Sequence, residues 1–576
     1  MTQTVAEAHT TTDTIKILVT DRVAQEGIDL LRTQLPEAQV DERFGLKPDE
    51  LKEIIGNYSA LVVRSETRVT SDVLAAATNL KIVGRAGVGV DNIDTEAATR
   101  RGIMVVNSPT GNIVAAAEHT IAMLMALARH IPAADASMKA GKWEKSRFLG
   151  VEVRNKVLGV IGLGKVGTEV ARRAQGLEMQ IVAFDPFVSA EHASKLGVTM
   201  TTLDEVLKQG DFVTLHTSLT SGPNGTRGLI GARELALMKP TARIINCARG
   251  GLIEEEPLLL ALQEGQLAGA ALDVFSQEPI RDNELLKRLV ANEHVIATPH
   301  LGASTEEAQV GVALDVAEQI VSVIHGGFPR AAVNAPLILP ETLKVLQPYM
   351  RLVEQMGRLY TQLQPGALSK VELSFSGEIA SYDLRPLQAA LIKGLLESIS
   401  DAHVNMINAQ VLAKQWGLEI VEQKSTTPSE FANQVTIRVP HHNGHRSSLA
   451  GPANAHLEKG DEHIEVLSGT VIHGEPRIVG VGRYGTEFVP EGYILFCRNL
   501  NQPGMIGRVG TLLGKAKVNI RHMDVGPIVR SPRPRSTQQA TDTALMVISV
   551  DDPIPTETLD EIAQVGDIFG VTVVAL

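Results

Sequence analysis

The chain has 576 residues, with 54 Lys and Arg against 66 Asp and Glu, which gives a formal net charge of -12. A hydrophobic content of 44% with 21% charged residues is typical of folded globular proteins and excludes intrinsic disorder. The acidic balance argues against a nucleic-acid partner, because clustered Lys and Arg hold phosphate backbones. Two cysteines, Cys247 and Cys497, exclude a disulfide framework and a four-thiolate metal site, so we expect no metal centre.

The first fourteen residues are polar and lack the basic and apolar stretches of a secretory signal, so we expect a frayed tail there. The most apolar long stretch, Val114 to Ile131, is interrupted by Glu118, His119 and Arg129, which argues against a membrane span. These features predict a cytoplasmic protein without a membrane partner.

From Ile15, short β-branched runs alternate with amphipathic helices, a pattern typical of a parallel sheet with crossover helices. A second series of this kind begins at Lys156 with KVLGVIGLG and closes with HVIATP. The pattern predicts two Rossmann-like, doubly wound α/β domains. We place the first at residues 15–111 plus 302–335, with a helix from Thr305 to about His325 returning the chain to it, and the second at residues 112–301.

After Pro336 the pattern changes, and residues 337–490 predict an α+β domain. Its expected helices are Glu341 to Leu363, Leu384 to Ile399 and Val404 to Trp416. Residues 492–576 then read as strand, helix, two strands, helix and strand, which is the βαββαβ order of a ferredoxin-like module. The Pro- and Arg-rich segment at residues 527–543 predicts a flexible loop between the two central strands.

The strongest local motif is a Gly-rich turn in which Gly162, Gly164 and Gly167 form G-x-G-x-x-G between a strand and a helix. Such glycines permit a tight turn, let a pyrophosphate approach the backbone and let the helix pack closely on the strand. The next strand ends in Asp185, where a carboxylate can accept hydrogen bonds from ribose hydroxyls. Pro and Phe, not Arg or Lys, follow Asp185, which favours NAD over NADP.

Three polar residues follow predicted strands of the same sheet: Arg249 in NCARGG, Glu278 in FSQEP and His300 in ATPHLGAST. Each could be structural by itself. The carboxyl ends of parallel strands share one crevice, however, so we expect the three to converge there. A guanidinium can hold a substrate carboxylate, an imidazole can take a hydroxyl proton, and a carboxylate can orient that imidazole.

Residues 15 to 335 resemble the D-isomer-specific 2-hydroxyacid dehydrogenases through VGRAGVGVDNID, NSPTGN, AEHTIAMLMALAR, VIGLGKVG, NCARGG, ALDVFSQEP and PHLGAST. The resemblance implies that the first domain binds substrate, that the second binds NAD, and that Arg249, Glu278 and His300 are catalytic. Val88 and Lys165 depart from side chains common in the family. The implied cofactor contacts are Gly162, Gly164, Lys165, Val166, Gly167, Asp185, Thr217, Cys247, Ala248, Arg249, Asp273, His300, Gly302 and Ala303.

The resemblance also places Arg64, Arg85 and Asn112 around the substrate. It implies NAD-dependent oxidation of 3-phospho-D-glycerate to 3-phosphooxypyruvate, the first step of L-serine biosynthesis. A basic group, Lys142, Lys145 and Arg147 beside Trp143, is expected to reach a neighbouring subunit or to form a solvated helix end. The alternatives are a broader 2-hydroxyacid or 2-oxoglutarate reductase and, more remotely, an NAD-sensing corepressor.

The C-terminal half is similar to an intervening domain and an ACT domain found together in long members of the family. The carrying segments include VNMINAQVLAKQWG and RNLNQPGMIGRVGTLLGKAKVNI. This similarity implies a homo-oligomer, a dimer or a tetramer, with L-serine as an effector bound where two ACT modules meet. The implied contacts are Asn499, Asn501 and Asn519, with Gly504 in the turn; Asn499 replaces the His of some regulated members. A purely oligomerising module is the alternative.

Overall fold

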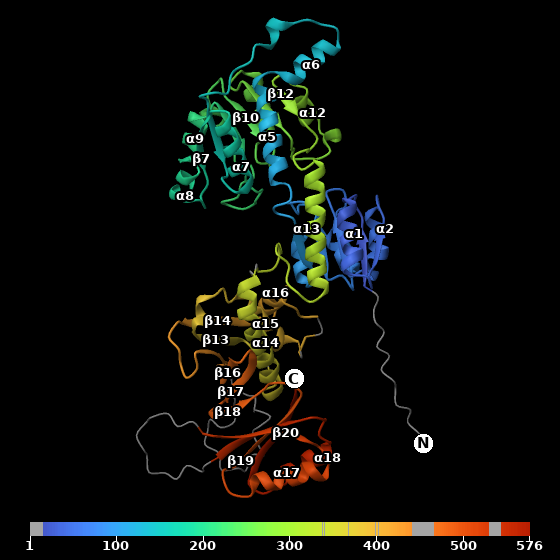
Figure 1. Cartoon of the computed structure of the whole chain (residues 1–576), viewed down its shortest axis with the longest axis vertical. Coiled ribbons are helices and arrows are strands. Elements are labelled where there is room, and N and C mark those ends of the chain that lie inside the picture. Colours follow the sequence, from blue (N-terminus) through green and yellow to red (C-terminus); the bar gives the residue numbers. More distant parts are fainter. Residues whose placement is uncertain are drawn as a thin grey trace.

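The computed structural model describes residues 15–336, 338, 340–366, 368–397, 399–400, 403–440, 466–528 and 543–576. The expected frayed tail at residues 1–14 and most of the expected loop at 527–543 lie outside the described residues. Four sheets follow one another along the chain. In Figure 1 the blue N-terminal body lies between the cyan-to-green body of the second sheet and the yellow-to-red C-terminal part. Within the described ranges, no helix has both the length and the apolar character required to cross a bilayer.

The first sheet has five parallel strands in the order β2-β1-β3-β4-β5, with apolar residues buried along its central strands. The polar edge strand β2, which lacks an apolar run, was not predicted from the sequence. Helix α13 (Glu306–Ile324) returns to this sheet as expected and packs against α1, where Gly27 leaves room for Ala313. The elements are β1 (Lys16–Val19), α1 (Gln25–Gln34), β2 (Gln39–Glu42), α2 (Pro48–Ile54), β3 (Ala60–Val63), α3 (Ser71–Ala76), β4 (Ile82–Arg85), α4 (Thr95–Arg100) and β5 (Met104–Asn107).

The second sheet has seven parallel strands in the order β12-β11-β10-β9-β6-β7-β8. Its strand order reverses at β6, which lies between β7 and β9, so the carboxyl ends of these strands border the crevice where such sheets bind ligands. The strands are β6 (Val157–Ile161), β7 (Gln180–Phe184), β8 (Thr199–Met200), β9 (Phe212–Leu215), β10 (Arg243–Asn246), β11 (Gly269–Leu272) and β12 (Val295–Ala297). The helices are α5 (Ile113–Ala128), α6 (Ile131–Lys139), α7 (Lys165–Gly176), α8 (Ala190–Lys195), α9 (Leu203–Gln209), α10 (Ala232–Leu237), α11 (Glu255–Gln263) and α12 (Glu284–Val290).

The third sheet is mixed, and its described strands have the order β14-β13-β15-β16-β17-β18. Two predicted helices are too long: α15 ends at Leu396, and α16 begins only at Ala409. The residues before α16 form a turn instead, because the Asn405 side-chain oxygen accepts the backbone N–H groups of Ile407 and Asn408. The elements are α14 (Pro340–Leu363), β13 (Lys370–Gly377), α15 (Arg385–Leu396), α16 (Ala409–Gln415), β14 (Glu419–Ser425), β15 (Asn433–Arg438), β16 (Val466–Ile472), β17 (Glu475–Val481) and β18 (Tyr484–Phe488).

The fourth sheet is antiparallel in the order β20-β21-β19-β22, and its elements follow the predicted βαββαβ sequence. One face packs against α17 and α18, whereas the other shares a core with the third sheet. Phe496 of this sheet meets Phe488 edge-to-face, with ring centroids 5.7 Å apart. The elements are β19 (Tyr493–Leu500), α17 (Met505–Lys515), β20 (Ile520–Pro527), β21 (Thr543–Val550), α18 (Thr556–Ala563) and β22 (Ile568–Ala575).

Candidate active site

The Gly-rich turn joins β6 to α7. A glycine is favoured at each of its three positions for a different reason. Gly162 has φ of +93°, and a Cβ there would lie 2.6 Å from the carbonyl oxygen of His216. A Cβ at Gly167 would overlap the carbonyl oxygen of Gly162. Gly164, at the N-cap of α7, faces open space. The fold itself therefore requires the first and third glycines, whereas the second leaves room at a helix N-terminus, where a phosphate is favoured.

Asp185 lies beside this turn and is fixed by it. Its two carboxylate oxygens accept the backbone N–H groups of Leu163 and Phe187, each at 2.8 Å. Thr217, next to Gly162, has a buried hydroxyl oxygen without a hydrogen-bond partner. An open helix N-terminus, an oriented carboxylate and an unsatisfied hydroxyl fit a dinucleotide. Of the other predicted contacts in the turn, Lys165 is exposed and Val166 is partly buried.

The loop after β10 is shaped by the Asn246 amide. Its oxygen accepts Ala248 N–H at 3.0 Å, and its nitrogen donates to the Arg249 carbonyl at 2.9 Å. Cys247 lies between Asn246 and Ala248. Burial raises the pKa of its thiol to about 12, and the charge of Asp273 adds to the effect. The thiol therefore stays protonated at neutral pH. The Arg249 guanidinium reaches the first domain, with Nε 3.3 Å from Asp91 Oδ2.

His300 and Glu278 form a direct pair. His300 Nδ1 lies 2.8 Å from Glu278 Oε2, while the other Glu278 oxygen accepts Phe275 N–H at 2.9 Å. Burial raises the pKa of Glu278, but the hydrogen bond and charge of His300 outweigh burial and hold that pKa below its usual value. An ionised Glu278 accepts the Nδ1 proton of the imidazole, which leaves Nε2 to exchange a proton with a substrate.

Three arginines from both domains lie near one another. Burial lowers the pKa of Arg85 to about 10, and the positive charges of Arg249 and Arg64 contribute to this lowering. Asn92 links two of them, because its oxygen accepts from Arg85 Nε at 3.3 Å and its nitrogen donates to the Arg64 carbonyl at 2.7 Å. Positive charges that repel one another at a buried position are stabilised by an anionic ligand between them.

Asn112 lies at the N-cap of α5 but makes no side-chain capping hydrogen bond. Its side-chain oxygen is buried and has no hydrogen-bond partner. The residue therefore has a polar atom available at the connection between the first two domains, where the sequence predicts a substrate contact.

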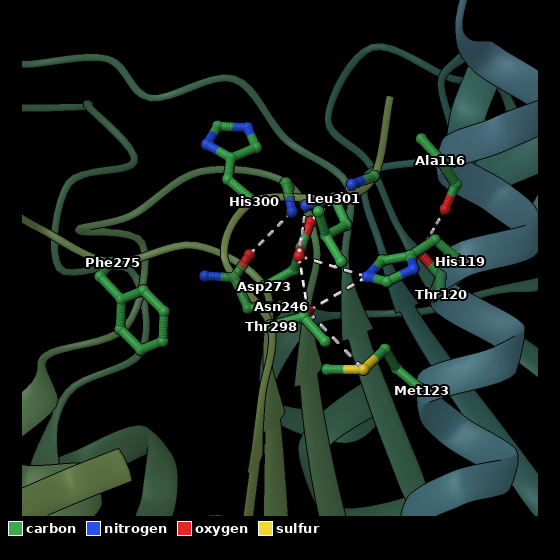
Figure 2. A network of polar contacts seen from close by, with 12 residues as sticks. Ala116, His119, Thr120, Met123, Asn246, Asp273, Phe275, Thr298, His300 and Leu301 are labelled. Atoms are coloured by element: carbon green, nitrogen blue, oxygen red, sulfur yellow. Dashed lines mark hydrogen bonds and ion pairs between the residues drawn. The ribbon is translucent and has the colours of Figure 1, made fainter. Parts of the chain in front are cut away.

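The structure places Asp273 in the wall behind the crevice. Its side chain is fully buried and accepts Thr298 Oγ1 at 2.6 Å, Leu301 N–H at 2.7 Å and Gly302 N–H at 2.8 Å (Figure 2). Asp273 therefore shapes the loop that carries His300, Gly302 and Ala303. His119 contacts the same carboxylate and was missed as a site residue; its one sequence signal was an imidazole inside an apolar helical stretch.

Two predicted groups are not assembled within one chain. Lys142, Lys145 and Arg147 follow α6 at the outer end of the second domain (Figure 1), where Arg147 Nη2 lies 3.5 Å from Glu293. Trp143 beside them is 81% exposed. Figure 1 places this segment far from the first domain, which contributes two of the three arginines described above.

The predicted effector residues are also separated. Asn499 is buried near the end of β19 and donates to the Leu500 carbonyl at 2.6 Å, while its side-chain oxygen has no partner. Asn501 follows β19, and Gly504, with φ of +94°, begins α17. Asn519 precedes β20 and donates to Asp551 at 2.6 Å. Since β19 and β20 both pair antiparallel with β21, they run in the same direction, so Asn501 and Asn519 lie at opposite ends of the sheet.

Comparisons with known proteins agree with this arrangement. Residues 121–302 match the D-isomer specific 2-hydroxyacid dehydrogenase, NAD binding domain; residues 345–459 match the D-3-phosphoglycerate dehydrogenase intervening domain; residues 493–567 match the ACT domain. D-3-phosphoglycerate dehydrogenase of Synechocystis is 44% identical over 555 residues, 96% of this chain and 93% of that protein. The chain belongs to the D-3-phosphoglycerate dehydrogenase family.

Other members of the family match over the same extent. The Archaeoglobus fulgidus D-3-phosphoglycerate dehydrogenase is 40% identical over 563 residues, 98% of this chain and 100% of that protein. Among solved structures, a Thermus thermophilus protein superposes with a TM-score of 0.51 at 32% identity, covering 55% of this chain and all of that one. D-lactate dehydrogenase of Aquifex aeolicus, complexed with NAD and lactic acid, has a TM-score of 0.50 at 25% identity over 56% of this chain and 99% of that one. The predicted family, fold class and cofactor NAD are confirmed.

Proposed function

We propose that this enzyme oxidises 3-phospho-D-glycerate at C2 to 3-phosphooxypyruvate, the first step of L-serine biosynthesis. The observation that supports the proposal is the His300–Glu278 pair beside the loop of Arg249, which itself lies near Arg85. Gly250, next to Arg249, packs against the Phe275 carbonyl, three residues before Glu278. A phosphorylated hydroxyacid needs both a proton acceptor and several cations. Full-length relatives from a cyanobacterium, an archaeon and Bacillus subtilis have the name D-3-phosphoglycerate dehydrogenase.

Each residue has a defined part in this mechanism. The N-terminus of α7 at Gly164 and the Asp185 carboxylate would hold NAD, which would supply the hydride acceptor. Arg249 holds the substrate carboxylate and polarises the neighbouring oxygen, because a guanidinium donates two parallel hydrogen bonds. Arg64 and Arg85, with Asn112, provide the remaining polar surface, including countercharge for the phosphate.

His300 is the residue that accepts the substrate proton. Glu278 accepts the Nδ1 proton at 2.8 Å and so fixes the tautomer in which Nε2 is free to accept the C2 hydroxyl proton. In the reverse direction the same nitrogen returns the proton to the carbonyl oxygen. Ionised Glu278 also stabilises the imidazolium that forms after proton transfer.

A steady-state assay tests the substrate. We expect the kcat/KM for 3-phosphoglycerate with NAD to exceed that for glycerate and for 2-hydroxyglutarate. Equal or higher values for 2-hydroxyglutarate would instead establish the broader reductase. Intact NAD binding without turnover of any hydroxyacid would contradict the enzymatic function and favour a corepressor role.

We also infer that the chain forms a homo-oligomer and that L-serine binds between two ACT modules. Asn501 and Asn519 lie at opposite ends of one module, so a ligand contacting both requires a second module. Exposed apolar side chains along and after α6, including Met138 and Leu149, support a subunit contact there. In such a contact, Lys142, Lys145 and Arg147 would reach the neighbouring subunit's crevice. The domain limits and the cytoplasmic location stay predictions.

A further inference from the structure

A second polar cluster lies behind the loop that carries His300. It contains Asp273, which follows β11, Thr298, which follows β12, and His119 of α5 (Figure 2). In Figure 2 the His300 ring points away from Asp273, so the ring and this cluster lie on opposite sides of the loop. Nothing in the mechanism above uses His119.

The proton positions in this cluster follow from its donors and acceptors. Nε2 of His119 lies 3.2 Å from both Asp273 Oδ1 and Thr298 Oγ1. The Thr298 hydroxyl donates its single proton to Asp273 at 2.6 Å, and a carboxylate can only accept. The remaining proton therefore belongs to His119 Nε2, which acts as a donor to the cluster.

The cluster ties together two segments that connect the first two domains. Helix α5 begins directly after Asn112, at the end of one connection, while Leu301 and Gly302 begin the other, which leads into α13. Asp273 accepts the backbone N–H groups of both Leu301 and Gly302. A Cβ at Gly302 would lie 4.0 Å from the Ala116 Cα atom of α5. His119 thus couples α5 to the loop that presents the proton acceptor.

We propose that His119 is a positioning residue for this reaction: through Thr298 and Asp273 it holds the backbone after His300, and so the place of the His300 imidazole in the crevice. The proposal rests on the proposed function of His300. His300 has φ of +55°, a left-handed conformation that needs support from its surroundings. The backbone N–H of His300 donates to the Asp273 carbonyl at 2.9 Å, which adds to that support.

The charge of Asp273 offers a readout that a loss of packing alone would not change. Burial raises the pKa of Asp273, but hydrogen bonds from His119, Thr298 and Leu301 outweigh burial and hold it below its usual value. The titratable groups facing it are His119 from α5, Cys247 after β10 and Glu278 after β11. The Cys247 thiol is neutral, whereas the negative charge of Glu278 would favour protonation of Asp273.

The sign of the pH effect follows from these groups. Because the pKa of Asp273 is depressed, its ionised form and the contacts it accepts persist above that pKa and are lost as the pH falls through it. Removing the His119 donor raises the pKa of Asp273. The hydrogen bonds that Asp273 accepts from Leu301 and Gly302 are then lost at a higher pH than in the wild type.

The test compares His119→Leu with His119→Gln, whose amide N–H can replace the Nε2 donor. We expect His119→Leu to lower kcat about 10- to 100-fold, the loss typical of a displaced reacting group, with a smaller change in the substrate KM. The pH at which the Leu301 and Gly302 amides lose protection from hydrogen exchange should rise, because Asp273 then loses its charge at a higher pH. His119→Gln should recover most of the kcat and the wild-type pH for that loss of protection. His192→Leu, the same change on the exposed face of α8, is the matched control and should behave as wild type.

A double-mutant cycle separates action through Thr298 from an independent effect. If His119 acts through Thr298 and Asp273, then Thr298→Val should cost little further kcat once His119→Leu is present. Additive losses of kcat, or equal losses of kcat in the Leu and Gln variants, would overturn the proposal. A kcat of His119→Leu close to wild type would also overturn it.

A second measurement does not depend on turnover. Hydrogen exchange at the Leu301 and Gly302 amides should be faster in His119→Leu than in the wild type and in His119→Gln, and equal rates would contradict the positioning role. If the wild type fails to oxidise 3-phosphoglycerate, the proposed substrate is wrong. The exchange comparison still tests His119 in that case.

Discussion

The crevice of the second sheet and the antiparallel C-terminal sheet collect their polar residues in opposite ways. Strands β9, β10, β11 and β12 all run in one direction, so residues that follow them meet at one edge within a single chain. In the C-terminal module, residues that follow β19 and residues that precede β20 lie at opposite ends. Strand direction therefore determines whether a site is complete in one chain or requires a second copy.

The largest expected effect is the loss of proton transfer at the crevice. His300→Asn should lower kcat roughly 10²- to 10⁴-fold, because it removes the proton acceptor. Coexpression of His300→Asn with Glu278→Gln should not restore activity above the sum of the separate variants, since the pair lies within one chain. Steady-state kinetics of the purified mixture checks this. Recovery on mixing would show that the proton-transfer pair is assembled between subunits.

In the C-terminal module, by contrast, two coexpressed variants should restore a functional site. Asn501→Ala and Asn519→Ala should each weaken L-serine binding roughly 10- to 150-fold, corresponding to a lost hydrogen bond to a charged ligand of about 1.5–3 kcal/mol. Mixed oligomers of the two variants should regain binding at one site, where both residues are wild type. Calorimetry with the coexpressed variants provides the measurement. A wild-type chain that binds no serine at millimolar concentration would leave the module with an oligomerising role only.

Two glycine substitutions in the Gly-rich turn separate its contribution to stability from its contribution to NAD binding. Gly167→Ala should destabilise the second domain by about 1–3 kcal/mol, because the new Cβ overlaps the Gly162 carbonyl oxygen. Gly164→Ala meets open space and should leave the unfolding temperature nearly unchanged while weakening NAD binding. Thermal unfolding and NAD titration of both variants distinguish the two effects. Equal loss of stability in both would contradict the assigned roles.

The last prediction concerns the two cysteines, one in each region, and leaves catalysis and ligand binding unchanged. Burial raises the pKa of Cys247 and of Cys497 to about 12, so little thiolate forms at neutral pH. Alkylation of the native chain by iodoacetamide at pH 8 should be at least about 100-fold slower than that of a free thiol. Cys247, which is partly exposed, should react before buried Cys497 as the pH rises. Mass spectrometry of the labelled peptides tests this order.

Much of this structure could be predicted from local patterns. Alternating apolar runs predicted both parallel sheets, and the βαββαβ order of the last module was correct. Errors occurred where side chains compete with the backbone or where a strand lies at an edge: Asn405 replaces the first turn of a predicted helix, and β2 has no apolar run. Neither case produces the hydrophobic periodicity on which the predictions rest.

The sequence by itself determined the family, the fold class and NAD, because the Gly-rich turn and the residues after each strand form contiguous patterns. Tertiary structure alone decided that Asp273 is buried behind the His300 loop and that His119 meets it, since those residues are far apart in the sequence and come from α5 and the end of β11. It also decided that Asn501 and Asn519 cannot meet in one module. Such contacts depend on how elements pack and in which direction strands run, and no local stretch of sequence encodes either property.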